Sequence, residues 1–232
     1  MTFLELVNRA RLEGDTSGAD LTTLGGTLSR ESTRFKTWVA EAWNEVQTLH
    51  DDWQWMRKSF SFDTVASLAT YTPTGGAGVG ANLADFANWK RDTFRLYTTS
   101  IGQNDEQILG FMDYETFRNQ YQYATMRTTD QRPAVFTIDP NKNIIFGARP
   151  NGIFTCVGDY YAKPTQLVAD SDTLTLLPDR FHMLVVWRAL LNYGEFEAAA
   201  EVMRRAERNL LRLQSALEVE YLPQMGFGPP LA

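Results

Sequence analysis

The chain has 232 residues, of which 44% are hydrophobic and 22% charged, and its formal net charge at pH 7 is -6. This composition predicts a globular protein of one or two domains with a hydrophobic core, and it excludes disordered and fibrous proteins. The acidic balance argues against a protein that coats nucleic acid, because phosphate contacts require a surplus of lysine and arginine. No apolar run approaches the roughly 20 residues of a membrane span, so we expect no membrane partner.

Residues that commonly carry catalysis are scarce. The sequence contains one cysteine, Cys156, and two histidines, His50 and His182. They are too few for an internal disulfide or for a zinc site built from thiolate and imidazole ligands. Histidine is also the commonest acid–base residue in enzymes. We therefore expect a soluble protein of a reducing compartment, with no enzymatic activity, no cofactor and no metal site.

The first predicted element is a helix that begins at Thr2. Thr2 and Glu5 fit a Thr-x-x-Glu capping box, in which each side chain binds the other residue's free backbone amide. Apolar residues follow at helical spacing, and Gly14 is expected to end the helix in a left-handed conformation. The polar, glycine-containing stretch 15–27 is then predicted to be a loop.

A second helix is predicted from Ser29, a favourable N-cap residue. From Phe35 to Leu49 the apolar side chains step by three and four residues, so one face of the helix is expected to enter a core. Two tryptophans follow directly. The four tryptophans between positions 38 and 55 are named here the tryptophan cluster: Trp38, Trp43, Trp53 and Trp55.

From about Phe60 the hydrophobic period changes to two, which predicts strands. The predicted strands cover 60–62, 94–98, 134–138, 144–146 and 153–161. The segment 139–143 supplies aspartate, proline and asparagine, which suit a hairpin turn. A short helix is predicted over 113–123, and the stretch 71–80 is expected to be a long loop.

Helical signals return near the C-terminus. Pro178 and Asp179 suit the start of a helix, and the stretch 181–193 is apolar nearly all round, which predicts a deeply buried helix. Gly194 is expected to end it. A longer helix with a heptad-like apolar seam is predicted over 195–221, and four arginines lie opposite that seam. The proline- and glycine-rich residues beyond it cannot continue the helix.

These elements predict an α+β fold that is mainly a helical bundle. Residues 1–58 and 176–222 would each supply two helices to the bundle. Residues 59–175 would form an inserted antiparallel β region, and residues 223–232 an extended C-terminal tail.

Several apparent motifs are better explained by ordinary structure. The Gly-x-Gly-x-x-Ala pattern at 76–81 lacks the strand, the helix and the acidic residue of a dinucleotide site, so a flexible loop is expected. The Asp139 turn lacks the glycine and glutamate that complete a calcium loop. His182 is interpreted as a core or interface histidine, and Cys156 as a small apolar residue within a strand.

Two interpretations stay open at the end of the second helix. His50 can interact with the helix dipole, or it can form an acid–base pair with Asp51 or Asp52. Trp53 and Trp55 can cover the end of a bundle, or they can form a platform that stacks sugars or bases. Together with a carboxylate pair such as Asp51 and Asp52, such a platform defines an alternative function: a carbohydrate-binding or glycan-degrading protein. Burial separates the two interpretations, because a sugar platform requires exposed rings.

Both ends of the chain resemble the head-to-tail adaptor proteins of tailed bacteriophages. At the N-terminal end the resemblance rests on FLELVNRA at 3–10, AWNEVQ at 42–47 and DWQW at 52–55. At the C-terminal end it rests on LPDRFH at 177–182, WRAL at 187–190 and YG at 193–194. These are packing motifs, and they cover roughly half of the chain.

The resemblance implies a structural virion protein. It implies a homo-oligomeric ring, usually of twelve copies, that lies below the portal, completes the DNA-filled head and provides the attachment platform for the tail. The implied partners are the portal protein, a tail or tail-completion protein and further copies of the chain. Genomic DNA would pass through the channel without sequence-specific binding. The protein would be made in the host bacterial cytoplasm and reside at the head–tail interface of the virion.

The resemblance also implies where the portal contact lies, since the C-terminal segment docks on the portal in that family. Here this segment comprises the predicted helix over 195–221 and the residues after it. The candidate portal or subunit interface consists of Arg204, Arg205, Arg208, Arg212, Tyr221, Leu222, Met225, Phe227 and Leu231.

Overall fold

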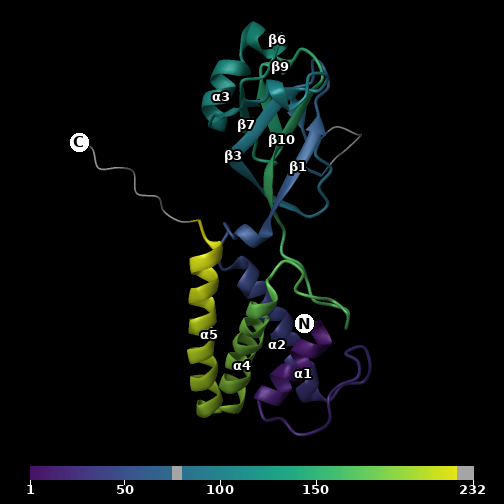
Figure 1. Cartoon of the computed structure of the whole chain (residues 1–232), viewed down its shortest axis with the longest axis vertical. Helices are drawn as coiled ribbons and strands as arrows, with labels where there is room; N and C mark the ends of the chain where they lie inside the picture. Colours follow the sequence, from purple (N-terminus) through teal and green to yellow (C-terminus); the bar gives the residue numbers. More distant parts are fainter. Residues whose placement is uncertain (75–79, 224–232) are drawn as a thin grey trace, which may run out of the picture. The chain divides into compact units, whose positions relative to one another are not determined.

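The structure, a computed structural model, describes residues 1–74 and 80–223 and has an α+β fold (Figure 1). The chain divides into two compact units. The helical unit contains Met1–Met56 and the described residues from Pro164 onward, and the β unit contains Arg57–Lys163. The chain thus leaves the helical unit once, builds the β unit and returns.

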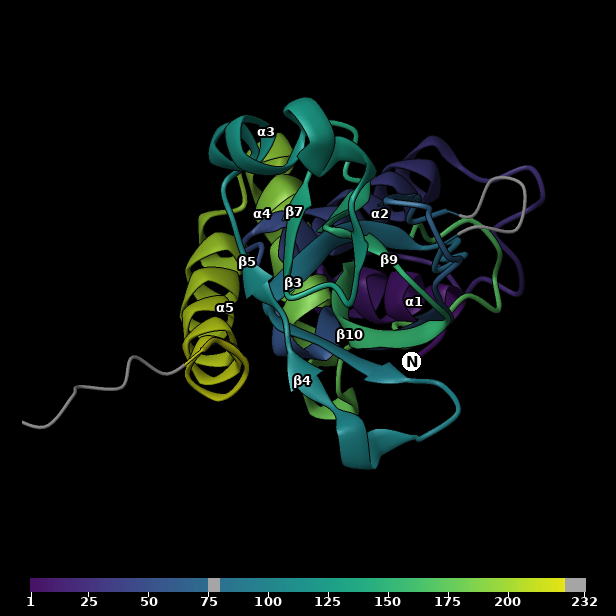
Figure 2. The ribbon, with the colours of Figure 1, turned by 90° about the horizontal axis from the view of Figure 1, so that it is seen from above.

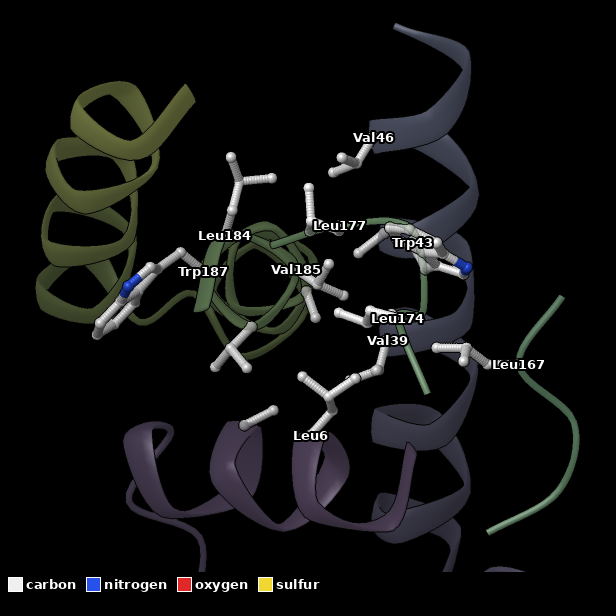
Figure 3. Packing of buried hydrophobic residues seen from close by; sticks show 14 of the residues in the cluster. Leu6, Val39, Trp43, Val46, Leu167, Leu174, Leu177, Leu184, Val185 and Trp187 are labelled. Atoms are coloured by element: carbon white, nitrogen blue, oxygen red, sulfur yellow. The ribbon is translucent and has the colours of Figure 1, made fainter. Parts of the chain in front are cut away.

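The helical unit contains four α-helices among its described residues. These are α1 (Phe3–Glu13), α2 (Arg30–Thr48), α4 (His182–Glu197) and α5 (Ala200–Tyr221). The short helices η1 (Gln54–Met56) and η4 (Asp179–Phe181) lie beside them in sequence. Figure 3 looks along α4, which lies between α5 and α2, with α1 crossing below. Side chains of α4 such as Leu184 and Val185 are buried there among those of the neighbouring helices.

The N-termini of α1 and α2 are confirmed as predicted. Thr2 and Glu5 form both hydrogen bonds of the capping box, and the Ser29 hydroxyl accepts from the Ser32 amide. The prediction for Gly14 is wrong, because this residue has a right-handed conformation with φ of -81°. A Cβ at Gly14 would lie 3.2 Å from a ring carbon of Phe35. Glycine is therefore suited to close packing at this position.

The predicted end of the fourth helix is also wrong. Helix α4 continues past Gly194 to Glu197, and Ala198 takes the left-handed conformation with φ of 51° that ends it. A Cβ on Gly194 would overlap Met203 Cγ of α5. The glycine allows α4 and α5 to approach closely, which explains its presence inside a helix.

The segment from Pro164 to α4 packs with the helices. Leu167, Leu174 and Leu177 belong to the core of the helical unit. The backbone carbonyl of Asp172 accepts a hydrogen bond from the Phe3 amide at 2.7 Å. Residues up to 175 were predicted to belong to the β region. The segment after Pro164 is irregular, and its packing against the helices leaves no periodic pattern in the sequence.

The β unit contains three sheets among its described residues. The largest has the order β1-β10-β3-β4 and is antiparallel throughout. Its strands are β1 (Arg57–Asp63), β10 (Phe154–Ala162), β3 (Phe86–Thr98) and β4 (Gln107–Ile108). In the view of Figure 2, β3, β4 and β10 can be followed side by side. The helix η2 (Gln103–Asp105) lies between β3 and β4 in sequence.

The second sheet has the order β2-β8-β7-β5. It consists of β2 (Thr70–Tyr71), β8 (Ile144–Gly147), β7 (Val135–Ile138) and β5 (Gly110–Phe111). The predicted hairpin is confirmed, since β7 and β8 pair across a turn in which Asp139 binds the backbone amide of Asn143. The third sheet pairs β6 (Asp130–Gln131) with β9 (Arg149–Pro150).

The β unit is not entirely antiparallel, which corrects the prediction. Two short pairs, β5 with β7 and β6 with β9, are parallel. Parallel neighbours require a long connection between the strands, often through a helix. Between β5 and β7 that connection contains α3 (Tyr114–Tyr121) and η3 (Ala124–Thr128). Helix α3 lies within the predicted range 113–123.

Aromatic side chains fill the interior of the β unit. Phe60, Phe94 and Phe136 belong to one buried cluster, and the rings of Phe94 and Phe136 stack with centroids 4.3 Å apart. Phe94 comes from the first sheet and Phe136 from the second, so this contact joins the two sheets. Each unit therefore has its own hydrophobic core.

Candidate interaction surfaces

Two kinds of feature are absent from the described residues, namely clusters of metal ligands and helices able to span a membrane. Within residues 1–74 and 80–223, no group of three or more histidine, cysteine, aspartate or glutamate side chains could hold a metal ion. In the same part of the chain, no helix has the length and apolar character needed to cross a membrane. The glycine pattern at 76–81 lies largely outside the described residues.

Both histidines make structural contacts within the helical unit. His182 is 3% exposed, and its Nε2 lies 2.9 Å from the Leu177 carbonyl oxygen. The prediction of a core histidine is therefore confirmed. His50 Nε2 lies 3.3 Å from a carboxylate oxygen of Glu218, and its ring packs edge-on against Trp53. No acid–base pair of His50 with Asp51 or Asp52 is formed, because the ring engages α5 instead.

Three members of the tryptophan cluster lie in the helical core, and the fourth, Trp38, packs partly buried against it. Trp43 and Trp53 are fully buried and Trp55 is 8% exposed. The Trp53 indole N–H donates to the Val46 carbonyl at 3.0 Å, and the rings of Trp43 and Trp55 stack. In Figure 3, Trp43 lies among buried aliphatic side chains. A sugar platform needs rings with an exposed face, so the burial of this cluster removes the support for a glycan site here.

Cys156 lies in the interior of the β unit. It is fully buried in β10, in register with Phe62 on one side and Leu96 on the other. Burial raises the pKa of its thiol well above the usual range. The side chain fills space among apolar neighbours, as predicted, and lacks the accessible thiolate that nucleophilic chemistry requires.

The four arginines of α5 have different environments. The Arg205 guanidinium donates to the Glu13 carbonyl, approaches the Glu13 carboxylate at 3.7 Å and lies over the Trp187 ring. Arg204 pairs with Glu201 on the same helix. Arg208 and Arg212 are exposed and form no ion pair within the described part of the chain. Arg205 therefore connects α5 to the end of α1, while Arg208 and Arg212 face outward.

The remaining candidate residues lie near the end of α5. The ring of Tyr221 meets the Phe181 ring edge-on, with centroids 6.1 Å apart. Tyr221 and Leu222 are partly buried against the helical core. Met225, Phe227 and Leu231 lie outside the described residues.

One surface of interest is the outer face of α5. Its buried face carries Ala206, Leu210 and Leu217. On the opposite side are exposed residues that we name the α5 stripe, with Leu211 64% exposed at its centre. The α5 stripe consists of Arg208, Leu211, Arg212 and Ser215. It combines an apolar side chain with two cationic groups.

A second surface is a groove beside α2, which the sequence analysis missed. Its apolar floor includes Phe3, fully buried, and Leu167, 6% exposed. The Lys36 ammonium on its wall donates to the Leu24 carbonyl at 3.0 Å. We name it the α2 groove; its lining consists of Phe3, Thr33, Lys36, Thr37, Ala40, Glu41, Asn44, Gln166 and Leu167. These residues come from three segments that are distant in the sequence. The exposed polar face of α2 was therefore the only part of the groove that the sequence could predict.

Comparison with known proteins identifies a family for this chain. The family model described as SU10 adaptor protein matches residues 1–226. The match spans the helical unit and the β unit, and it includes the α5 stripe and the α2 groove. No curated protein matches the chain.

Proposed function

The chain belongs to the SU10 adaptor protein family, a family of phage head-to-tail adaptors, and we propose that it forms a ring below the portal that completes the DNA-filled head and provides the attachment platform for the tail. Membership makes it a structural bacteriophage virion protein that interacts with portal and tail proteins in general. The ring, its twelve copies, its position and its synthesis in the host bacterial cytoplasm are parts of the proposal.

The observation that carries this proposal is the family match over residues 1–226, which includes both the helical unit and the β unit. The environments of the polar residues support a non-enzymatic role. His182 and Cys156 are buried, and His50 contacts Glu218 and Trp53. We therefore propose that the protein acts through its surfaces.

The net charge supports the proposed path of DNA. A chain with a formal charge of -6 repels the phosphate backbone on average. Repulsion would let genomic DNA slide through a ring without sequence-specific binding. A strongly basic lining would instead hold the DNA, because counterion release makes phosphate contacts favourable.

We further propose a division of labour along the chain. The helical unit would form the bundle that builds the body of each ring subunit, and the β unit would be inserted into it. The residues from Tyr221 onward, including Met225, Phe227 and Leu231, would carry the portal contact. A proline- and glycine-rich segment can order on a neighbouring protein and cover much surface for modest affinity.

Binding to the portal ring from the same genome tests the proposal. The full chain and a variant ending at Leu222 are each mixed with the ring and studied by sedimentation and negative-stain imaging. We expect added density at one end of the ring with the full chain and its loss with the truncated variant. A third variant with the sequence of 223–232 shuffled controls for the mere presence of extra residues.

Each other outcome has a definite meaning. Binding that survives both truncation and shuffling would keep the adaptor function and move the portal contact to the helices. Absence of binding by the full chain at micromolar concentration would contradict the proposed function.

A further inference from the structure

We propose that the α5 stripe of one copy of this chain seats in the α2 groove of the next copy. This inference rests on the proposed function and adds to it the surfaces through which neighbouring subunits meet. The partner is a second copy of the same chain. The contact is heterologous, since the two surfaces that meet are different.

The first support is the position of the two surfaces on the helical unit. Helix α4 packs against α5 and also against α2, so the three helices form a row with α5 and α2 at its ends (Figure 3). Seen from above, α5 likewise lies on the side of α4 away from α1 (Figure 2). The α5 stripe and the α2 groove therefore face away from each other. Opposed, different surfaces that bind each other produce rings or open chains of subunits.

The second support is that the two surfaces lie at comparable heights along the helix axes. Helices α2 and α5 run in the same direction, with α4 antiparallel between them (Figure 1). Positions 37–44 occupy the middle of α2, and positions 208–215 occupy the middle of α5. Two copies with the same orientation can thus place the stripe beside the groove without a large axial shift.

The third support is charge. From position 203 to 213 the chain carries four arginines against one glutamate, Glu207. The charged residues that line the α2 groove are Lys36 and Glu41, and the Lys36 ammonium already donates to the Leu24 carbonyl at 3.0 Å. Opposite charges on two surfaces that meet favour association and fix the register of the contact.

Within the groove, Glu41 is the carboxylate best placed to receive an arginine. It lines the groove, is exposed and forms no ion pair with any residue the structure describes. Glu45, one turn along α2, is already paired with Arg188 at 2.6 Å. Arg208 or Arg212 of the next copy would give Glu41 a partner.

The apolar parts of the two surfaces also match. Leu211 lies between Arg208 and Arg212 and is 64% exposed, which leaves most of its side chain in water. The groove offers Phe3, Ala40 and Leu167 as an apolar lining. Placing Leu211 there removes its exposed apolar surface from water, a contribution of about 25 cal/mol for each Å² buried.

Disulfide trapping tests this contact. A variant with both Leu211→Cys and Ala40→Cys carries one thiol on each surface, while native Cys156 is fully buried and does not compete. Under mild oxidation we expect a ladder of cross-linked species beyond the dimer, because every copy offers both ends. Mixing the two single variants should give the heterodimer. Replacing Leu211→Cys by Leu12→Cys, at an equally exposed leucine of α1, is the control and should give no ladder.

Charge reversal provides a second, independent readout. We expect Arg208→Glu in the two-thiol variant to slow cross-linking about tenfold, and adding Glu41→Arg to restore much of the rate. Arg30→Glu makes the same change in net charge at the exposed start of α2 and should have little effect. Equal rates for Arg208→Glu and Arg30→Glu, or the absence of a ladder, would overturn the proposal.

The same experiment on the portal ring separates this inference from the proposed function. If the two-thiol variant binds the portal ring but gives no ladder there, the adaptor function stands and the proposed subunit contact is wrong. If the ladder forms in solution but the full chain never binds the portal ring, the contact stands and the adaptor function is contradicted.

Discussion

At the residue scale, Asp105 shows how a single carboxylate organises the chain after β3. Arg132 Nη1 contacts both carboxylate oxygens of Asp105, at 2.7 and 2.8 Å, and the Thr98 hydroxyl donates to the same group. Arg132 also donates to the backbone carbonyl of Asp105 at 2.6 Å. These contacts connect η2 to a segment that lies 27 residues further along the chain. Neither residue belongs to a periodic pattern, so the pair could not be predicted from the sequence.

The first prediction concerns the acid dependence of this pair. Hydrogen bonds from Arg132, and then from Thr98, lower the pKa of Asp105 from 3.8 to about 2. Because the pKa is lower in the folded state, the stabilisation is complete above about pH 4 and is lost as the pH falls toward about 2. We therefore expect the free energy of unfolding, measured by urea denaturation, to fall in this range.

The matched variant is Asp105→Asn, which keeps the shape of the side chain and removes its ionisation. Its free energy of unfolding should fall less between about pH 4 and about pH 2 than that of the unmodified chain. Parallel pH profiles for the two proteins would show that the Arg132 contact adds nothing in the folded state.

The contacts of Arg205 could not be predicted from the spacing of residues in the sequence. In sequence it belongs to a run of arginines opposite an apolar seam, which predicts an exposed basic face. In the structure it donates to the Glu13 carbonyl at the end of α1 and lies over Trp187. The last carbonyls of a helix lack partners within the helix, and a cation from another helix can satisfy them. Only the position of α1 decides this role.

At the element scale, the packing of α4 against α5 depends on Gly194. Two effects of Gly194→Ala oppose each other. Alanine favours the helical conformation by about 1 kcal/mol relative to glycine. The new Cβ overlaps Met203 Cγ, and forcing an extra carbon into a packed contact typically costs about 1–3 kcal/mol.

The second prediction is that the cost of the overlap with Met203 exceeds the gain in helix propensity. Gly194→Ala should lower the free energy of unfolding by up to about 2 kcal/mol, as the balance of the two effects. In a Met203→Ala background, where the overlapping atom is absent, the same substitution should be neutral or stabilising. Urea denaturation of the four proteins measures this coupling. An equal effect of Gly194→Ala in both backgrounds would show that the contact with Met203 is not its cause.

The elements differ in how well the sequence predicted them. The capping box at Thr2, the N-cap at Ser29 and the hairpin turn at Asp139 depend on residues within a few positions of each other, and all are confirmed. Helix α1 ends at Gly14 as predicted, but the predicted left-handed conformation of Gly14 and the predicted end of α4 at Gly194 are wrong, since both glycines serve contacts with another helix. The parallel pairs β5–β7 and β6–β9 were missed because the direction of a partner strand leaves no periodic signal.

At the scale of the whole molecule, the β unit is an insertion whose two ends lie together. Strands β1 and β10 pair along their length, and Arg57 is the register partner of Tyr161. Directly opposed residues of antiparallel strands have Cα atoms about 4.5–5.5 Å apart. The chain therefore enters and leaves the β unit at neighbouring points, as is common for inserted domains.

The third prediction is that each unit folds without the other. Residues 57–163 should give a cooperative thermal transition by circular dichroism, because their aromatic core is complete. A chain in which a short glycine–serine link replaces residues 57–163 should retain the helical unit.

The matched control removes residues 59–175 instead, the range that the sequence suggested for the β region. This deletion also takes away Leu167 and Leu174, which are buried in the helical core. Losing a buried leucine side chain costs about 2–5 kcal/mol, so this variant should be much less stable than the first. Similar stability of the two deletion variants would show that the segment after Pro164 is not needed by the helical unit.

The sequence by itself determined the four long helices and parts of the longer strands, which of their faces are apolar, and that histidine and cysteine are too scarce for common catalytic sites. It also carried the resemblance to phage adaptors at both ends of the chain. These properties follow from residue type and from spacing within a few positions, where the backbone fixes the geometry.

Only the tertiary structure decided what faces outward and what is enclosed. It buried Trp43, Trp53 and Trp55, turned Arg205 toward α1, left Arg208 and Arg212 exposed, and built the α2 groove from three distant segments. The physical reason is that burial and ion pairing depend on atoms close in space. In this chain those atoms come from residues up to 192 positions apart, as for Arg205 and Glu13.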